Sequence, residues 1–198
     1  MMNIQLHFWF DFASSYSYPA VLRVSKFIKD QPIDIVWHPF LLGAIFQQQG
    51  WLDSPFNLFP SKGRYMWRDL ERVCEQDNIP FNRPSLFPRN GLLAARVVAN
   101  HADQPWVKAF IQAVFQANFV HDLDINDVVV ISNILQHLGM DAQLILAHAT
   151  TDAGKLKLKQ QTMLAQSHEV FGAPFFIVGD EHFWGNDRLE QAIHYALK

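Results

Sequence analysis

The chain has 198 residues, of which 49% are hydrophobic, and a formal net charge of −3 with an isoelectric point near 6.3. This length suits one globular domain, or a core that carries a large insertion. The charge balance is weakly acidic and no basic run is interleaved with aromatic residues, so we expect no nucleic acid partner.

The sequence also argues against export and membrane attachment. The N-terminus lacks a positively charged leader, and His7 and Asp11 interrupt its apolar run. The longest apolar stretches fall far short of the ~20 residues that a membrane-spanning helix needs. A single cysteine, Cys74, excludes an intramolecular disulfide and dithiol redox chemistry. We therefore expect a cytoplasmic protein in which Cys74 is a buried structural thiol.

The first forty residues have the pattern of a strand–helix–strand unit. Residues 4–10 form an apolar run that is typical of a buried strand, and residues 15–29 have helical spacing behind turn and capping residues. Residues 33–37 predict a second strand after the Gln31-Pro32 turn.

Helical spacing dominates from residue 41 to about residue 169. We expect helices over residues 64–76, 91–101, 105–119 and 125–138, and two short helices beyond Asp141. Asp124 and Gly139 are predicted to cap and stop the helix over residues 125–138.

The C-terminal residues return to a strand pattern. Residues 175–178 and 182–184 flank a short Gly-containing loop, which is typical of a β-hairpin, and residues 185–187 open a terminal helix. This order predicts an α/β protein with a thioredoxin-like βαβ…ββα core and an inserted all-α helical domain. Residues 1–40 and 170–198 would form the thioredoxin-like domain, and residues 41–169 the inserted helical domain.

Ser14 lies between the first predicted strand and the first predicted helix, where a thioredoxin-like protein has its reactive cysteine. The N-terminus of a helix favours negative charge, because unpaired backbone N–H groups and the helix dipole point at it. The position could therefore hold a thiolate that the chain itself does not supply. Alternatively, Ser14 only caps the helix. No histidine pairs with Ser14 in the sequence, so a serine-hydrolase mechanism has little support.

Four motifs in the right order carry a resemblance to a known family. They are Phe10-Asp11-Phe12-Ala13-Ser14-Ser15-Tyr16-Ser17-Tyr18, against a family pattern F-D-x-x-S-P-Y-S-Y, and the runs over residues 38–46, 60–66 and 170–190. The chain resembles the 2-hydroxychromene-2-carboxylate isomerase family, which is close to kappa-class glutathione transferases and more distantly similar to DsbA-type disulfide oxidoreductases. The similarity spans nearly the whole chain.

The resemblance implies a glutathione-dependent enzyme in which Ser14 is the catalytic serine. Its hydroxyl and the helix N-terminus would lower the pKa of the glutathione thiol from about 8.5, the value of a free cysteine. The resemblance also implies a cis peptide bond at Ala173-Pro174, with Ala173 pairing with the glutathione backbone as an added strand. The alternative for Pro174 is an ordinary turn proline.

Three further residues are implied to bind glutathione. Asn186 and Asp187 begin the terminal helix, where free N–H groups suit the γ-glutamyl carboxylate and the Asp187 side chain suits its ammonium group. Both residues could equally be helix caps. Lys62 matches a glutathione-contacting lysine of the family, although a lone lysine is more often a solvated surface charge. Arg188 is predicted to be a structural ion-pair partner.

Aromatic residues in or near the motifs predict an apolar pocket for a planar aromatic substrate. These residues are Phe12, Tyr16, Phe46, Trp51, Phe56, Phe59, Trp67 and Trp184, and we expect half or more of them to be ordinary core residues. Tyr16, Phe46 and Trp51 are the ones that we expect to bind the substrate. Two features depart from the family pattern. Ser15 replaces a proline, and the loop over residues 51–59 is one or two residues longer, so the substrate side could differ.

The combined evidence from sequence favours a glutathione-dependent cis–trans isomerase of the 2-hydroxychromene-2-carboxylate type, acting on an unsaturated aromatic ketoacid. The alternatives are a kappa-class-like glutathione transferase and a non-catalytic thiol-binding or redox-adaptor module. The nine histidines are scattered and match no metal motif, so we expect no metal and no inorganic cofactor. The family resemblance suggests a homodimer.

Overall fold

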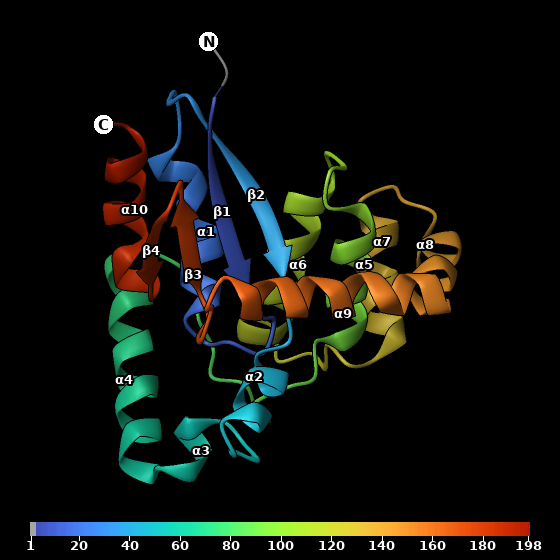
Figure 1. Ribbon diagram of the computed structural model, residues 1–198. Coiled ribbons are helices and arrows are strands. Elements are labelled where there is room, and N and C mark those ends of the chain that lie inside the picture. Colours follow the sequence, from blue (N-terminus) through green and yellow to red (C-terminus); the bar gives the residue numbers. More distant parts are fainter. Residues whose placement is uncertain (1–2) are drawn as a thin grey trace.

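A computed structural model describes residues 3–198 and contains one four-stranded sheet. The strands are β1 (Ile4–Phe10), β2 (Ile33–Pro39), β3 (Phe175–Val178) and β4 (Glu181–Trp184), and their order in the sheet is β2-β1-β3-β4. Strand β1 pairs in parallel with β2 and antiparallel with β3, and β3 forms a hairpin with β4 (Figure 1). Gly179 has φ +58° in the hairpin turn, a conformation that favours glycine.

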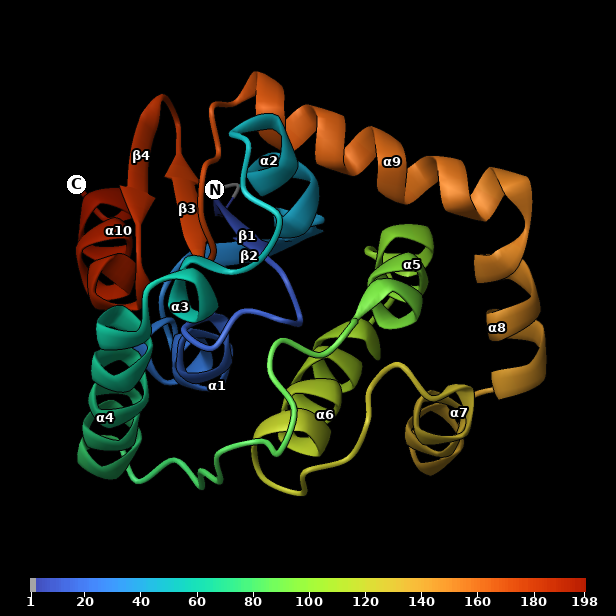
Figure 2. The same ribbon diagram turned by 90° about the horizontal axis from the view of Figure 1, so that it is seen from below.

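The two faces of the sheet follow from the alternation of side chains along β1 and β3. Leu6, Phe8 and Phe10 point into the larger apolar cluster together with Phe176, whereas Trp9 points to the opposite face. Helices α1 (Ser17–Phe27) and α10 (Leu189–Ala196) pack on the face of Phe8. Helices α2 (Leu42–Gln48) and α9 (Asp152–Ser167) lie on the face of Trp9 (Figure 2).

Like α2 and α9, the remaining α-helices lie between β2 and β3 in the sequence. They are α3 (Pro55–Leu58), α4 (Pro60–Gln76), α5 (Leu92–His101), α6 (Val107–Phe119), α7 (Val128–His137) and α8 (Ala142–Thr150). A single turn of 3₁₀ helix, η1 (Asn186–Arg188), leads into α10. The predicted fold class is confirmed.

Several details of the helical segment differ from the sequence prediction. Helices α2 and α3 were not predicted, and α4 begins at Pro60 and not at residue 64. The cap of α7 is Asp127, whose side chain accepts a hydrogen bond from the Val129 N–H at 2.8 Å, and not Asp124, whose carboxylate accepts one from the Asn126 N–H. Two helices follow Asp141, as expected, but only α8, with 9 residues, is short, whereas α9 has 16. Gly139 does end α7, with φ +74°.

One continuous apolar cluster joins the sheet to the helical segment. Phe10 and Phe12 on the sheet side contact Phe115 of α6, with ring centroids 6.1 and 5.1 Å apart. Cys74 of α4 lies in the same cluster and is 1% exposed. Burial raises the pKa of its thiol to about 12, so Cys74 is a structural residue and stays protonated at neutral pH.

Candidate functional site

Ser14 lies in the turn between β1 and α1, where its hydroxyl makes two contacts. Its Oγ accepts a hydrogen bond from the Ser17 N–H, at the first residue of α1, over 3.2 Å. The same hydroxyl donates to the carbonyl of Ala173 over 2.9 Å. The N-cap residue of α1 is Tyr16, which gives no side-chain cap, so Ser14 supplies the acceptor for the first N–H of the helix from two residues further back. Its hydroxyl also joins two segments that are 159 residues apart in the chain.

The segment at Ala173 leads directly into β3. The Ala173-Pro174 peptide bond is cis, as the family resemblance implied. The Pro174 carbonyl accepts a hydrogen bond from the Gly185 N–H over 3.0 Å, which brings the start of η1 beside this segment. Ala173 is only partly buried, and its N–H donates to no protein acceptor within residues 3–198. It is therefore available to a ligand.

Asn186 and Asp187 begin η1 and have opposite environments. Asn186 is buried, and its Oδ1 has no hydrogen-bond partner in the described part of the chain. The Asp187 side chain is 74% exposed and lies 3.7 Å from Arg188. Arg188 is thus an ion-pair partner of its neighbour, and a solvent-exposed pair of this kind contributes little to stability.

Arg23 of α1, which the sequence analysis missed, connects this region to α4. Its guanidinium forms a largely buried ion pair with Asp77 at 2.6 Å, and it also donates to the backbone carbonyl of Asn186 over 3.3 Å. This arginine holds α1, the end of α4 and the start of η1 together. No sequence motif announces such a pair, because its partners lie 54 and 163 residues away.

The predicted substrate residue Tyr16 points toward α4. Its hydroxyl donates to Asp69 Oδ2 over 2.9 Å, and Asp69 also accepts from Arg72 over 3.0 Å. Burial and this hydrogen bond raise the pKa of Tyr16, so its hydroxyl remains protonated near neutral pH and its one proton is donated to Asp69. Asp69 is a second residue that the sequence analysis missed.

Lys62 and the predicted aromatic residues lie around α2, α3 and α4. Lys62 is exposed in the first turn of α4, and its Nζ lies 4.8 Å from the Phe59 ring centroid. The partly exposed rings of Phe46 and Trp51 are 5.4 Å apart. The ring that approaches Tyr16 is that of Phe56, at 6.2 Å. No hydrogen bond joins Lys62, Phe46 or Trp51 to Ser14 among the described residues.

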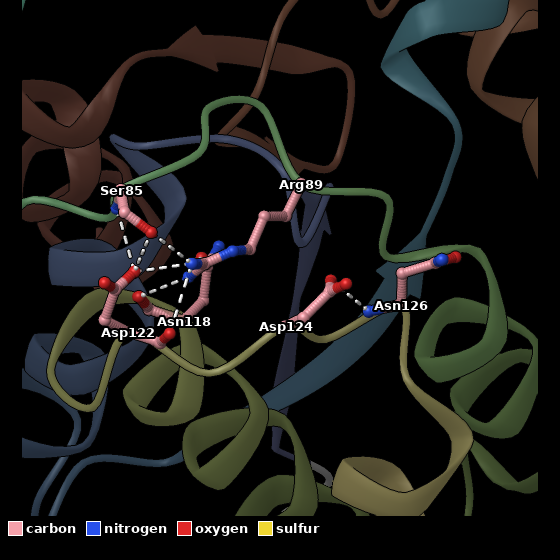
Figure 3. A network of polar contacts seen from close by, with 6 residues as sticks. All are labelled: Ser85, Arg89, Asn118, Asp122, Asp124 and Asn126. Atoms are coloured by element: carbon pink, nitrogen blue, oxygen red, sulfur yellow. Dashed lines mark hydrogen bonds and ion pairs between the residues drawn. The ribbon is translucent and has the colours of Figure 1, made fainter.

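A buried arginine, Arg89, lies at the centre of a polar network on the helical side (Figure 3). Arg89 is 5% exposed and forms an ion pair with Asp122, and it also donates to Asn118 Oδ1 over 3.2 Å. Asn118 in turn donates to the Phe12 carbonyl over 3.5 Å. Hydrogen bonds from the Ser85 backbone and from Arg89 lower the pKa of the Asp122 carboxyl, which keeps it ionised.

Within residues 3–198, no three histidine, cysteine or acidic side chains lie close enough together to hold a metal ion. No helix in this range combines the length and hydropathy that a membrane crossing requires.

Comparison with known proteins places the chain in a family. The model of the DSBA-like thioredoxin domain matches residues 5–198. The 2-hydroxychromene-2-carboxylate isomerase of Pseudomonas sp. (strain C18) is 30% identical over 92% of this chain and 85% of its own length. Human glutathione S-transferase kappa 1 is 26% identical over 94% of this chain and 88% of its own.

A solved structure agrees with the sequence comparisons. The structure of a 2-hydroxychromene-2-carboxylate isomerase superposes with a TM-score of 0.88 and 25% identity, covering 97% of this chain and 94% of the other. The chain therefore belongs to the DSBA-like thioredoxin family and, within it, to the group of enzymes that includes the 2-hydroxychromene-2-carboxylate isomerases.

Proposed function

We propose that this protein is a glutathione-dependent cis–trans isomerase of the 2-hydroxychromene-2-carboxylate type, acting on an unsaturated aromatic ketoacid. The observation that carries the proposal is the position of Ser14, whose hydroxyl accepts from the first N–H of α1 and contacts Ala173 beside a cis-proline. The similarity to the isomerase of Pseudomonas sp. (strain C18) supports the reaction type, and the similarity to human glutathione S-transferase kappa 1 supports the use of glutathione.

The residues present fit a glutathione thiol and its peptide backbone. The N–H of Ala173 has no protein acceptor in the described chain and can pair with an extended peptide. Asn186 Oδ1 is an unpaired acceptor at the start of η1, and Asp187 is an accessible carboxylate for the γ-glutamyl ammonium group. Lys62 is accessible to a ligand carboxylate. We assign these residues to glutathione and Tyr16, Phe46 and Trp51 to the aromatic substrate.

Bound glutathione would supply a thiolate that adds reversibly to the unsaturated ketoacid and makes one of its double bonds temporarily single. The Ser14 hydroxyl has one proton, which it gives to the Ala173 carbonyl in this structure. Rotation about the Cβ–Oγ bond would redirect that proton to the sulfur, while Oγ continues to accept from the Ser17 N–H. The serine and the N-terminus of α1 would thus stabilise negative charge on sulfur.

The test is the ionisation of the bound thiol. We expect ultraviolet thiolate absorbance, measured against pH, to give a pKa for bound glutathione below the free value of about 8.5. Ser14→Ala should raise this pKa and lower turnover roughly 10²-fold, because a donor to the developing charge is lost. Ser25→Ala is the control, since this serine lies further along α1 and its hydroxyl has no partner in the described chain. An unshifted thiol pKa in the wild type would refute the proposal.

A kappa-class-like glutathione transferase is the second candidate, favoured by the 26% identity to the human kappa enzyme. The two reactions differ in the fate of glutathione. An isomerase returns it after each turnover, whereas a transferase consumes one thiol for each conjugate released. Titration of free thiol during turnover therefore separates them. We further propose a homodimer and a cytoplasmic location.

A further inference from the structure

Asp11 is a buried carboxylate in the turn between β1 and Ser14. It is 9% exposed, and both carboxylate oxygens are hydrogen-bonded. Oδ1 accepts from the Ala13 N–H over 2.8 Å, and Oδ2 accepts from the Leu42 N–H over 2.8 Å. The backbone carbonyl of Asp11 also accepts from the Ser14 N–H over 3.0 Å. One residue thus holds three backbone donors.

These contacts link two segments that are 31 residues apart in the sequence. Ala13 and Ser14 belong to the turn that leads into α1. Leu42 is the first residue of α2, and the residue before it, Leu41, gives α2 no side-chain cap. The first N–H groups of a helix lack partners within the helix, so Asp11 supplies from the neighbouring loop what an N-cap side chain normally supplies.

A carboxylate suits this position better than other side chains do. Burial raises the pKa of Asp11, because removing the charged carboxylate from water costs free energy. The two backbone hydrogen bonds oppose that effect, and they are made only when the carboxylate has this orientation. An asparagine of the same shape has one acceptor oxygen, and its amide would face an N–H donor with another donor. The arrangement therefore requires the acid.

We propose that Asp11 is a positioning residue that locks the Ser14 turn and α2 in one fixed relation. It touches no reactant and acts through the groups it holds. Its contact with Ala13 fixes the turn that carries Ser14, whose hydroxyl we propose to donate to the glutathione sulfur. Its contact with Leu42 fixes the start of the segment that continues to Phe46 and Trp51, which are assigned to the aromatic substrate. The catalytic part of this inference rests on the proposed function, whereas the coupling of the two segments does not.

Two variants break the link from opposite ends. Asp11→Asn removes one acceptor. Leu42→Pro removes the N–H that donates to Oδ2 together with the leucine side chain. Proline is tolerated at the first position of a helix, and Leu41 already has an extended backbone, with φ −99° and ψ 98°. Leu42→Ala is the control that removes the side chain and keeps the N–H. Asp127→Asn is the control for a carboxylate that bonds only its own helix, through the Val129 N–H.

Amide hydrogen exchange of the protein alone measures whether the Ser14 turn and α2 are coupled. We expect Asp11→Asn and Leu42→Pro each to accelerate exchange over residues 13–17 and 42–48 together, and the double variant to add little to either. Leu42→Ala and Asp127→Asn should leave the exchange over residues 13–17 slow. In turnover assays, kcat should fall roughly 10-fold to 100-fold in both test variants, with a smaller change in KM for glutathione, because alignment is lost while the binding groups remain.

The possible failures are distinct. Faster exchange in only one of the two segments would overturn the proposal, as would an equal effect of Leu42→Ala. If Asp11→Asn does not fold, Leu42→Pro still decides the coupling, since it leaves the carboxylate in place. A wild-type protein without glutathione-dependent turnover would refute the proposed function instead, and the exchange data would still confirm or overturn the link through Asp11.

Discussion

The chemistry assigned to Ser14 depends on a single proton with two possible acceptors. In this structure it goes to the Ala173 carbonyl, so the hydroxyl is already oriented and its oxygen is already held by the Ser17 N–H. Redirecting it to a sulfur costs one neutral hydrogen bond and gains one to a charged acceptor, which is roughly twice as strong. Preorganisation at this residue is thus a property of the fold and not of the ligand.

Asp187 tests the γ-glutamyl end of the site at the residue scale. Asp187→Ala should weaken glutathione binding by about 1.5 kcal/mol, the lower end for a hydrogen bond to a charged group, because the side chain is 74% exposed and solvent screens its charge. Calorimetric titration measures the change. Asp180→Ala, in the exposed β3–β4 turn, removes the same charge elsewhere and should leave affinity unchanged. Equal losses in both variants would show a general electrostatic effect and contradict the assignment.

His38 makes stability depend on pH. Its ring stacks on Trp9 and is within hydrogen-bonding distance of His7 and Gln161. Burial lowers the pKa of His38 from 6.5 to about 3, and the charges of His7 and His168 add to this effect. In the unfolded chain His38 is therefore protonated below pH 6.5, whereas in the folded chain it is protonated only below about pH 3. The stability contributed by neutral His38 is complete above pH 6.5 and is lost as the pH falls.

We expect the free energy of unfolding to decline between pH 7 and pH 5, with a slope from His38 that approaches about 1.4 kcal/mol per pH unit. Asp11 acts in the opposite sense, since its pKa is raised, so the slope is compared between the wild type and His38→Asn, in both of which Asp11 is present. Urea unfolding should give a shallower slope for His38→Asn than for the wild type. His121→Asn, at an exposed position, should keep the wild-type slope. An unchanged slope in His38→Asn would contradict this origin.

At the scale of elements, the junction of α3 and α4 depends on a close backbone approach. A Cβ added at Gly63 would lie 2.3 Å from the Phe56 carbonyl oxygen, which cannot move without shifting α3. Gly63→Ala should therefore destabilise the protein by about 1 to 3 kcal/mol, despite the higher helix propensity of alanine. In Gly43→Ala the added Cβ meets nothing within 4 Å, so this control in α2 should be neutral or stabilising. Denaturant unfolding compares the two. Equal effects would rule out the clash.

The elements that sequence predicted best are those whose buried face is apolar. The strands and α6 have such faces, and the position of Ser14 between β1 and α1 followed from them. Helix α9 was predicted poorly because its buried face consists of Gly154, Leu158, Thr162 and Ala165, which give little hydrophobic period. The capping error at Asp124 arose because two aspartates precede α7 and either could have capped it.

The buried polar groups of the site were beyond prediction. Arg89 bonds to Asp122, 33 residues away, and to Asn118 of α6, 29 residues away. Arg23 bonds to Asp77 across 54 residues. Neither separation follows a helical or strand period, so no local pattern marks the partners. Asp11 is part of the motif over residues 10–18, but its hydrogen bond from the Leu42 N–H depends on the path of the chain that brings the start of α2 beside the end of β1.

At the scale of the whole molecule, the residues assigned to glutathione come from both ends of the chain and from its middle. We propose the domain boundaries at residues 40/41 and 169/170, yet Phe10 and Phe12 share one apolar cluster with Phe115 of α6. A shared core means that neither part buries its apolar surface alone. We therefore expect the two parts to unfold together.

Ligand binding tests this expectation and the proposed function at once. Glutathione at 100 times its dissociation constant should stabilise the fold by about 2.7 kcal/mol, which raises the melting temperature of a chain of this size by roughly 5 to 10 °C. Because Ser14, Lys62 and Ala173 would be held together by one ligand, the whole transition should move as a single step.

Calorimetry measures the shift in melting temperature, with dithiothreitol at the same thiol concentration as the control that lacks a peptide backbone. S-methylglutathione, which keeps the backbone and loses the thiolate, should give a smaller shift. A helical transition that stays at its original temperature while another moves would show that the inserted segment unfolds independently, and an equal shift with dithiothreitol would show that the peptide part of glutathione is not recognised.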